Sequence, residues 1–98
     1  MKWETKVLRE IAKTDGTLTV ESGSTVEVRF TLTQTQDFID GIPTLRSAFG
    51  TIEFKNMKEA WRIFNSSAKK TLRGGGIEAE VFIASLDSFR VAGPLNEI

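Results

Sequence analysis

Apolar and polar residues alternate in several segments of the chain, which is the pattern of β-strands with one buried and one solvated face. Residues 25–33 give the clearest case, since every second position is apolar: Val26, Val28, Phe30 and Leu32. The positions between them are polar or charged. We therefore predict an antiparallel strand over 25–33.

Residues 3–13 also alternate, although Val7, Leu8 and Ile11 fit a helical stripe as well. We predict a strand because Asp15-Gly16 follows, and an Asp-Gly pair between apolar runs is a strong signal for a hairpin. Residues 17–21 are then the return strand. A turn at Ser22-Gly23-Ser24 leads into the strand over 25–33.

The alternation stops over residues 34–48, which we interpret as an irregular loop with a turn at Asp40-Gly41-Ile42-Pro43 and a short helical turn within 44–49. The loop contains apolar residues that suggest contact with the core or with a partner: Phe38, Ile39, Ile42 and Leu45. A further strand is predicted over 51–55, with Ile52 and Phe54 facing inward.

An amphipathic helix is predicted to begin at Asn56, whose side chain can cap it, with Glu59 completing a capping box. Apolar residues follow at steps of three and four: Met57, Ala60, Trp61, Phe64, Ala68 and Leu72. Gly74 is expected to end the helix. Trp61 lies on this stripe, so we expect it in the core.

After the helix, alternation predicts a strand over 77–83, a turn over 85–88 and a strand over 89–91, while residues 93–98 are expected to fray. The sequence thus predicts one α+β domain over 1–98. Its mostly antiparallel sheet has five to six strands, and one helix packs on one face. The predicted order is three strands, a loop, a strand, a helix and two strands.

Composition excludes several classes of chemistry. The 98 residues include no cysteine and no histidine, which removes disulfides, thiolate nucleophiles, the commonest transition-metal ligand and the usual general base. We predict no catalytic, metal or cofactor site, and no small-molecule ligand is indicated. No apolar run approaches the ~20 residues of a membrane span, and no signal-peptide pattern begins the chain. We therefore expect a cytoplasmic protein that does not bind membranes.

The net charge of zero hides an uneven distribution, because residues 41–73 hold seven Lys and Arg against two acids. On the predicted helix, cations fall on the side opposite the apolar stripe. The candidate surface for a polyanion or a protein partner comprises Lys55, Lys58, Arg62, Lys69, Lys70 and Arg73. Glu59 is the one acid between Lys55 and Arg73, so few helical ion pairs are expected to balance these cations.

Three functions remain open. The first is a non-enzymatic interaction module that binds itself or a protein partner, with Trp3, Phe38, Ile39 and Ile42 as the candidate interface. The alternative is binding of single-stranded DNA or RNA, in which the cations contact phosphates and the aromatic residues stack on bases. The third is a small enzyme or ligand carrier with a pocket between helix and sheet.

Overall fold

Seven strands and one short helix make up the fold, which the computed structural model describes for residues 1–21 and 23–98. The elements are β1 (Trp3–Val20), β2 (Thr25–Ile39), β3 (Ile42–Phe54), α1 (Met57–Phe64), β4 (Lys70–Gly74), β5 (Ile77–Ser85), β6 (Ser88–Val91) and β7 (Asn96–Glu97). The sheet is antiparallel throughout its pairings, so the predicted α+β class with a mostly antiparallel sheet is confirmed. The predicted number of strands was too low.

Six of the strands close into a barrel. The pairings run β4–β1–β2–β3–β6–β5, and β5 then pairs back with β4. The short β7 pairs with β5 outside this ring. Closure removes the free edges that an open sheet would have carried in this part of the molecule.

The barrel interior is filled by the apolar positions that alternation identified. In β2, Val26, Val28, Phe30 and Leu32 are all buried, as predicted. Phe30 and Phe89 meet edge to face in the centre, with ring centroids 6.2 Å apart. The rest of the core comes from the other strands and the helix: Leu18, Val20, Ile52, Ile63, Leu72, Ile77 and Val81.

The predicted hairpin at Asp15-Gly16 is wrong, because β1 runs through these residues without a turn. Gly16 instead lies where β1 closes the barrel against β4, directly opposite Gly74. A Cβ atom on Gly16 would stand 2.6 Å from the carbonyl oxygen of Arg73 and 2.7 Å from the Phe30 ring. The glycine therefore permits close packing rather than a turn. Of the predicted turn at 22–24, Ser22 lies outside the described residues.

The predicted loop over 34–48 is also wrong, and so is the helical turn within 44–49. β2 and β3 continue through these residues as a long hairpin. The turn itself is at Asp40 and Gly41, whose φ angles of 51° and 79° suit a tight hairpin connection. The prediction failed because alternation with a buried face requires a core, and this hairpin extends beyond the core.

The helix begins as predicted but is much shorter. The Asn56 side chain accepts a hydrogen bond from the Lys58 amide at 2.9 Å. The helix ends at Phe64, where Asn65, Ser66 and Ser67 follow; such side chains compete with helical hydrogen bonds. Gly74 is not a helix cap but the end of β4. Leu72 is buried from a strand, and α1 buries Ala60 and Ile63 while Trp61 is exposed, contrary to our prediction.

The strands and the turn over residues 77–91 agree with the sequence-based interpretation, whereas the fraying predicted for residues 93–98 is wrong. Ile77, Ala79 and Val81 are buried at alternate positions of β5, and a turn at residues 86–87 leads into β6. Residues 93–98, for which we expected fraying, place Leu95 against the core and form β7.

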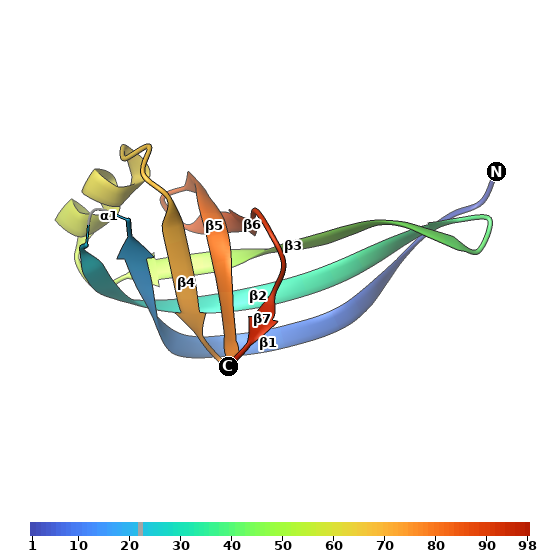
Figure 1. Cartoon of the computed structure of the whole chain (residues 1–98), viewed down its shortest axis with the longest axis horizontal. Helices are drawn as coiled ribbons and strands as arrows, with labels where there is room; N and C mark the ends of the chain where they lie inside the picture. Colours follow the sequence, from blue (N-terminus) through green and yellow to red (C-terminus); the bar gives the residue numbers. More distant parts are fainter. Residues whose placement is uncertain (22) are drawn as a thin grey trace.

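An arm of three strands projects from the barrel (Figure 1). It consists of residues 3–10 of β1, 33–39 of β2 and 42–48 of β3, and it gives the molecule extents of 46 × 24 × 19 Å. The helix α1 lies at the opposite end of the long axis (Figure 1). The fold thus separates two ends with different surfaces.

The close packing of β3 against its neighbours leads us to predict that a side chain at Gly50 destabilises the fold. A Cβ atom there would collide with the backbone carbonyl of Thr31 and come within 3.1 Å of the Phe89 ring. We expect Gly50→Ala to lower the free energy of unfolding in urea by about 3 kcal/mol, because backbone must move to accommodate it. Gly93→Ala is the control, since nothing lies within 4 Å of its Cβ position. Equal stability of the two variants would contradict the close packing described here.

Candidate functional site

One face of the arm carries apolar residues, most of them exposed, among threonines and acidic residues. Register places Trp3 opposite Ile39, and Ile39 opposite Ile42, so the three share a face at the arm tip. The same alternation adds Val7 and, just beyond the base of the arm, Phe49. We call this surface the apolar arm face, defined as Trp3, Val7, Ile39, Ile42 and Phe49. Trp3 is 60% exposed and Ile42 is 65% exposed, so neither contributes much to folding.

The residues of the apolar arm face occupy the strand positions that, within the barrel, point outward to solvent. Residues at the same phase of β2 within the barrel, such as Glu27 and Arg29, are charged and exposed. In the arm this phase carries apolar residues and threonines, and its charged members are Glu10 and Asp37. The Asp37 carboxylate accepts a hydrogen bond from the Thr5 hydroxyl at 2.7 Å. Trp3, Ile39 and Ile42 thus lie at outward positions of the arm tip, whereas β2 carries charged residues at the same phase within the barrel.

The opposite face of the arm is polar. Gln36 is buried there, and its side chain donates to the Leu45 carbonyl at 3.3 Å and accepts from Arg46 at 3.0 Å. Phe38 also lies on this face, under the ammonium of Lys6 at 5.2 Å. The structure therefore brings three predicted interface residues together and separates Phe38 from them.

The arm has two edges without a strand partner in the described chain. These are residues 3–10 of β1 and 42–48 of β3. Both edges carry features that discourage pairing with another strand: Pro43 lacks an amide hydrogen, and β1 has a register shift between Val7 and Arg9. The apolar face, rather than an edge, is the better candidate for recognition.

A second apolar surface lies at the other end of the molecule. A groove of about 630 Å³ runs between α1, the end of β3 and the β5–β6 turn. Trp61 and Phe64 meet edge to face on its helix side, with centroids 6.4 Å apart. We call this the α1 groove; its apolar lining is Ile52, Phe54, Met57, Trp61, Phe64 and Leu86.

The sequence did not identify the α1 groove, because the apolar stripe of the predicted helix was assigned to the core. Met57, Trp61 and Phe64 are all on that stripe. The large size of these three side chains was the sequence feature that could have revealed the groove. The eight-residue helix buries only Ala60 and Ile63, which leaves its larger apolar side chains exposed.

The predicted basic residues do not share one helix face, because α1 ends before Lys69. Only Lys58 and Arg62 lie on the helix. Lys69 and Arg73 lie near Glu80 and Glu78, at 3.9 and 3.7 Å. These exposed pairs are of small energetic value, but they balance the cations locally.

Two other cations of the predicted polyanion surface, Lys70 and Lys55, form hydrogen bonds or ion pairs within the fold. Lys70 is 7% exposed, and its ammonium donates to the carbonyls of Ser66 and Ala68 at 2.7 and 3.0 Å. Lys55 pairs with Glu27 at 2.9 Å, which lowers the pKa of Glu27 and raises the pKa of Lys55 through their hydrogen bond. These two cations therefore serve the fold in ways that the sequence pattern did not indicate.

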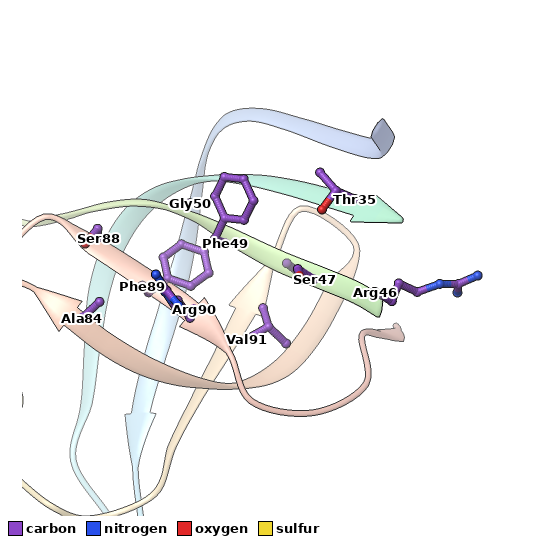
Figure 2. Close-up of a pocket in the computed structure, with 11 residues that line it drawn as sticks. Thr35, Arg46, Ser47, Phe49, Gly50, Ala84, Ser88, Phe89, Arg90 and Val91 are labelled. Carbon is purple, nitrogen blue, oxygen red and sulfur yellow. The ribbon is translucent and has the colours of Figure 1, made fainter. Parts of the chain in front are cut away.

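A third surface lies beside the base of the arm, where a shallow pocket of about 650 Å³ includes two arginines (Figure 2). Arg90 belongs to β6, and Arg46 extends away from the pocket in this view. Arg46 is also held by Gln36. The two guanidinium groups do not converge, so the pocket does not form a defined anion site.

Within residues 1–21 and 23–98, no three acidic side chains gather as a metal site. Nor does that part of the chain contain a helix long and apolar enough to cross a membrane.

Comparison with known proteins gives no relative: no family model, no curated protein and no solved structure matches the chain significantly. Function has to be inferred from the surfaces themselves.

The pairing of Lys55 with Glu27 makes a prediction about titration. Because the lowered pKa belongs to the folded state, the pair stabilises the fold at neutral pH, and this contribution is lost as pH falls through the pKa of Glu27. We expect Lys55→Met to raise the pKa of Glu27, measured by carbon NMR of its carboxyl group. Lys58→Met removes a cation that makes no ion pair with Glu27 and is expected to leave that pKa unchanged. The same shift in both variants would contradict the pairing.

Proposed function

We propose that the protein is a non-enzymatic assembly module that docks on another protein molecule through the apolar arm face. The observation that carries this proposal is the tip of the arm, where the exposed Trp3 and Ile42 flank the partly exposed Ile39 on one face. Aromatic and aliphatic clusters with few charges are typical of the centres of protein interfaces.

The arm offers a preformed docking surface and adds little to the stability of the barrel. Its outward residues are too far from the barrel core to pack there, and yet two hydrogen bonds between Lys2 and Asp40 hold the tip in place. The Lys2 amide donates to the Asp40 carboxylate at 2.8 Å, and the Asp40 amide donates to the Lys2 carbonyl at 2.9 Å. A preformed apolar surface loses little conformational freedom on binding, which favours affinity.

The other functions have less support. Binding of single-stranded nucleic acid would draw on the six predicted cations, but three of them lie beside acids and Lys70 is buried against backbone carbonyls. Catalysis or ligand binding would need convergent polar groups, which the α1 groove offers only at Glu53, Ser85 and Asp87. The cytoplasmic location expected from the sequence stays a prediction.

The test is the double variant Trp3→Ser/Ile42→Ser. Because both side chains are exposed, we expect the variant to fold and melt like the wild type. We expect its binding to be at least about thirtyfold weaker, since buried tryptophans are frequent hot spots of interfaces. Sedimentation over a concentration series measures self-association. Capture from an extract of the source cells, with quantitative mass spectrometry, measures binding to other proteins.

Phe82→Ser is the matched control, since Phe82 is an equally exposed aromatic residue (66%) on the barrel wall in β5. We expect this variant to behave like the wild type. Equal losses in both variants would indicate nonspecific adhesion of apolar residues and would overturn the proposal. So would an arm variant that binds as tightly as the wild type.

A further inference from the structure

We propose that two copies of the chain pair through residues 3–7 of β1, so that their arms join into one antiparallel sheet about a two-fold axis at Thr5. This inference goes beyond the proposed function, because it concerns a strand edge and not the apolar arm face. It is carried by the register of β1, which fixes the direction of the backbone groups along this edge.

The backbone of residues 3–7 offers a regular set of unpaired hydrogen-bonding groups. The Asp40 amide donates to the Lys2 carbonyl at 2.9 Å, so the backbone of Lys2 faces β2. In an antiparallel pair this direction alternates from one residue to the next. The amides and carbonyls of Trp3, Thr5 and Val7 therefore point away from β2, where no strand within residues 1–21 and 23–98 pairs with them.

The features that discourage pairing along the arm lie outside this stretch. The register shift of β1 comes after Val7, and Glu97 of β7 approaches Arg9 at 3.6 Å. Pro43 belongs to the other edge of the arm, on β3. Residues 3–7 therefore form a regular edge that is available to another strand.

Pairing of this edge with itself gives complementary neighbours at every position. When Thr5 lies opposite its own counterpart, Trp3 lies opposite Val7 of the second copy. Glu4 then lies opposite Lys6, and each of these pairs occurs twice. An aromatic beside a β-branched residue, two threonines, and opposite charges are all favourable cross-strand combinations.

The neighbouring registers are less favourable because they bring like charges together. An axis one residue closer to the amino terminus places Glu4 opposite Glu4, and an axis one residue further along places Lys6 opposite Lys6. Like charges directly opposite each other are destabilising. Charge therefore selects the register with Thr5 on the axis.

The charged pairs select the register more than they drive association. Lys2 already contacts Glu4 at 3.0 Å in the single molecule, and Lys6 is exposed. Exposed ion pairs contribute little energy. The driving contribution comes from the backbone hydrogen bonds and from contact of Trp3 with Val7, which are 60% and 57% exposed in the single molecule.

The geometry keeps the two barrels apart. β1 runs from the arm tip toward the barrel, so antiparallel pairing points the barrels of the two copies in opposite directions (Figure 1). A two-fold axis perpendicular to the sheet leaves the apolar arm faces of both copies on the same side. Edge pairing therefore joins the two faces into one continuous surface.

Disulfide trapping tests the register, since the chain has no cysteine of its own. Thr5→Cys places two thiols opposite each other on the axis, at a Cα separation of about 5.5 Å that a disulfide can span. Thr44→Cys is the matched control, because Thr44 is an exposed threonine on the other edge of the same arm.

Under mild oxidation we expect Thr5→Cys to form a covalent dimer at least about tenfold faster than Thr44→Cys, because its thiols meet within a complex rather than by collision. Equal rates in the two variants, or a faster rate in Thr44→Cys, would overturn the pairing of β1.

Exchange of charges tests the selection of the partner. Glu4→Lys and Lys6→Glu each put like charges opposite one another at both ends of the pairing. We expect each variant alone to self-associate at least about tenfold more weakly than the wild type in sedimentation equilibrium. A one-to-one mixture restores opposite charges at both positions, so we expect a dimer of the two variants with wild-type affinity.

The controls for this exchange are Glu59→Lys and Lys58→Glu, which make the same changes of charge on α1. We expect both to associate like the wild type, alone and when mixed. Thermal melting confirms that every variant is folded. Restored association that is equally strong in the mixture of control variants would reflect net charge alone and would overturn the proposed pairing.

The outcomes separate this inference from the proposed function. The charge variants keep Trp3 and Ile42, so capture of another protein by the apolar arm face is expected to persist when self-association is lost. A wild type that remains monomeric, with no faster cross-linking at Thr5, would overturn edge pairing and leave the proposed function standing. Self-association that is lost in Trp3→Ser/Ile42→Ser but kept in both charge variants would mean that faces meet instead of edges, which also overturns edge pairing.

Discussion

The fold depends on β4, a strand of five residues that must pair on both sides at once. It joins β1 to β5, and these two pairings close the barrel. The closure is tight because Gly16 and Gly74 face each other there without side chains. Because β4 is needed as a strand, the chain from Lys70 onward is not available to a helix. Lys70 and Arg73 therefore lie on a strand rather than on the helix, which already ends at Phe64 before Asn65, Ser66 and Ser67.

Once the barrel is closed, the length of its first three strands exceeds what the other strands can cover. β6 pairs with β3 only at residues 49–51, and β4 pairs with β1 only at residues 16–20. The excess length becomes the arm, which has no core on either side. Apolar residues in the arm therefore cannot be explained by folding in the way that those of the barrel can. The same reasoning applies to Met57 and Trp61 on a helix too short to bury them.

Local patterns predicted the parts of the fold that have a buried face on one side. The strands at 25–33 and 77–83, the helix cap at Asn56 and the turn before β6 were all evident from residue type and spacing. The errors have one origin, which is that local rules do not include distant partners. Asp15-Gly16 has the residues of a hairpin turn, and residues 65–73 continue a helical stripe, but pairing of β1 with β4 overrides both. Of the candidate sites, the clustering of Trp3, Ile39 and Ile42 required the register of the arm, which the sequence does not reveal.

The continuity of β1 through arm and barrel has a mechanical consequence. A force applied at the arm tip, directed along the strands, is carried into the barrel by unbroken chain rather than by a hinge. Hydrogen bonds between antiparallel strands lie perpendicular to the strands, so such a force loads many of them simultaneously. The pairings between β1 and β2 extend over residues 3–19 and 25–39, which distributes the load across most of the length of both strands. A molecule of this design resists extension along its long axis much better than peeling of its edges.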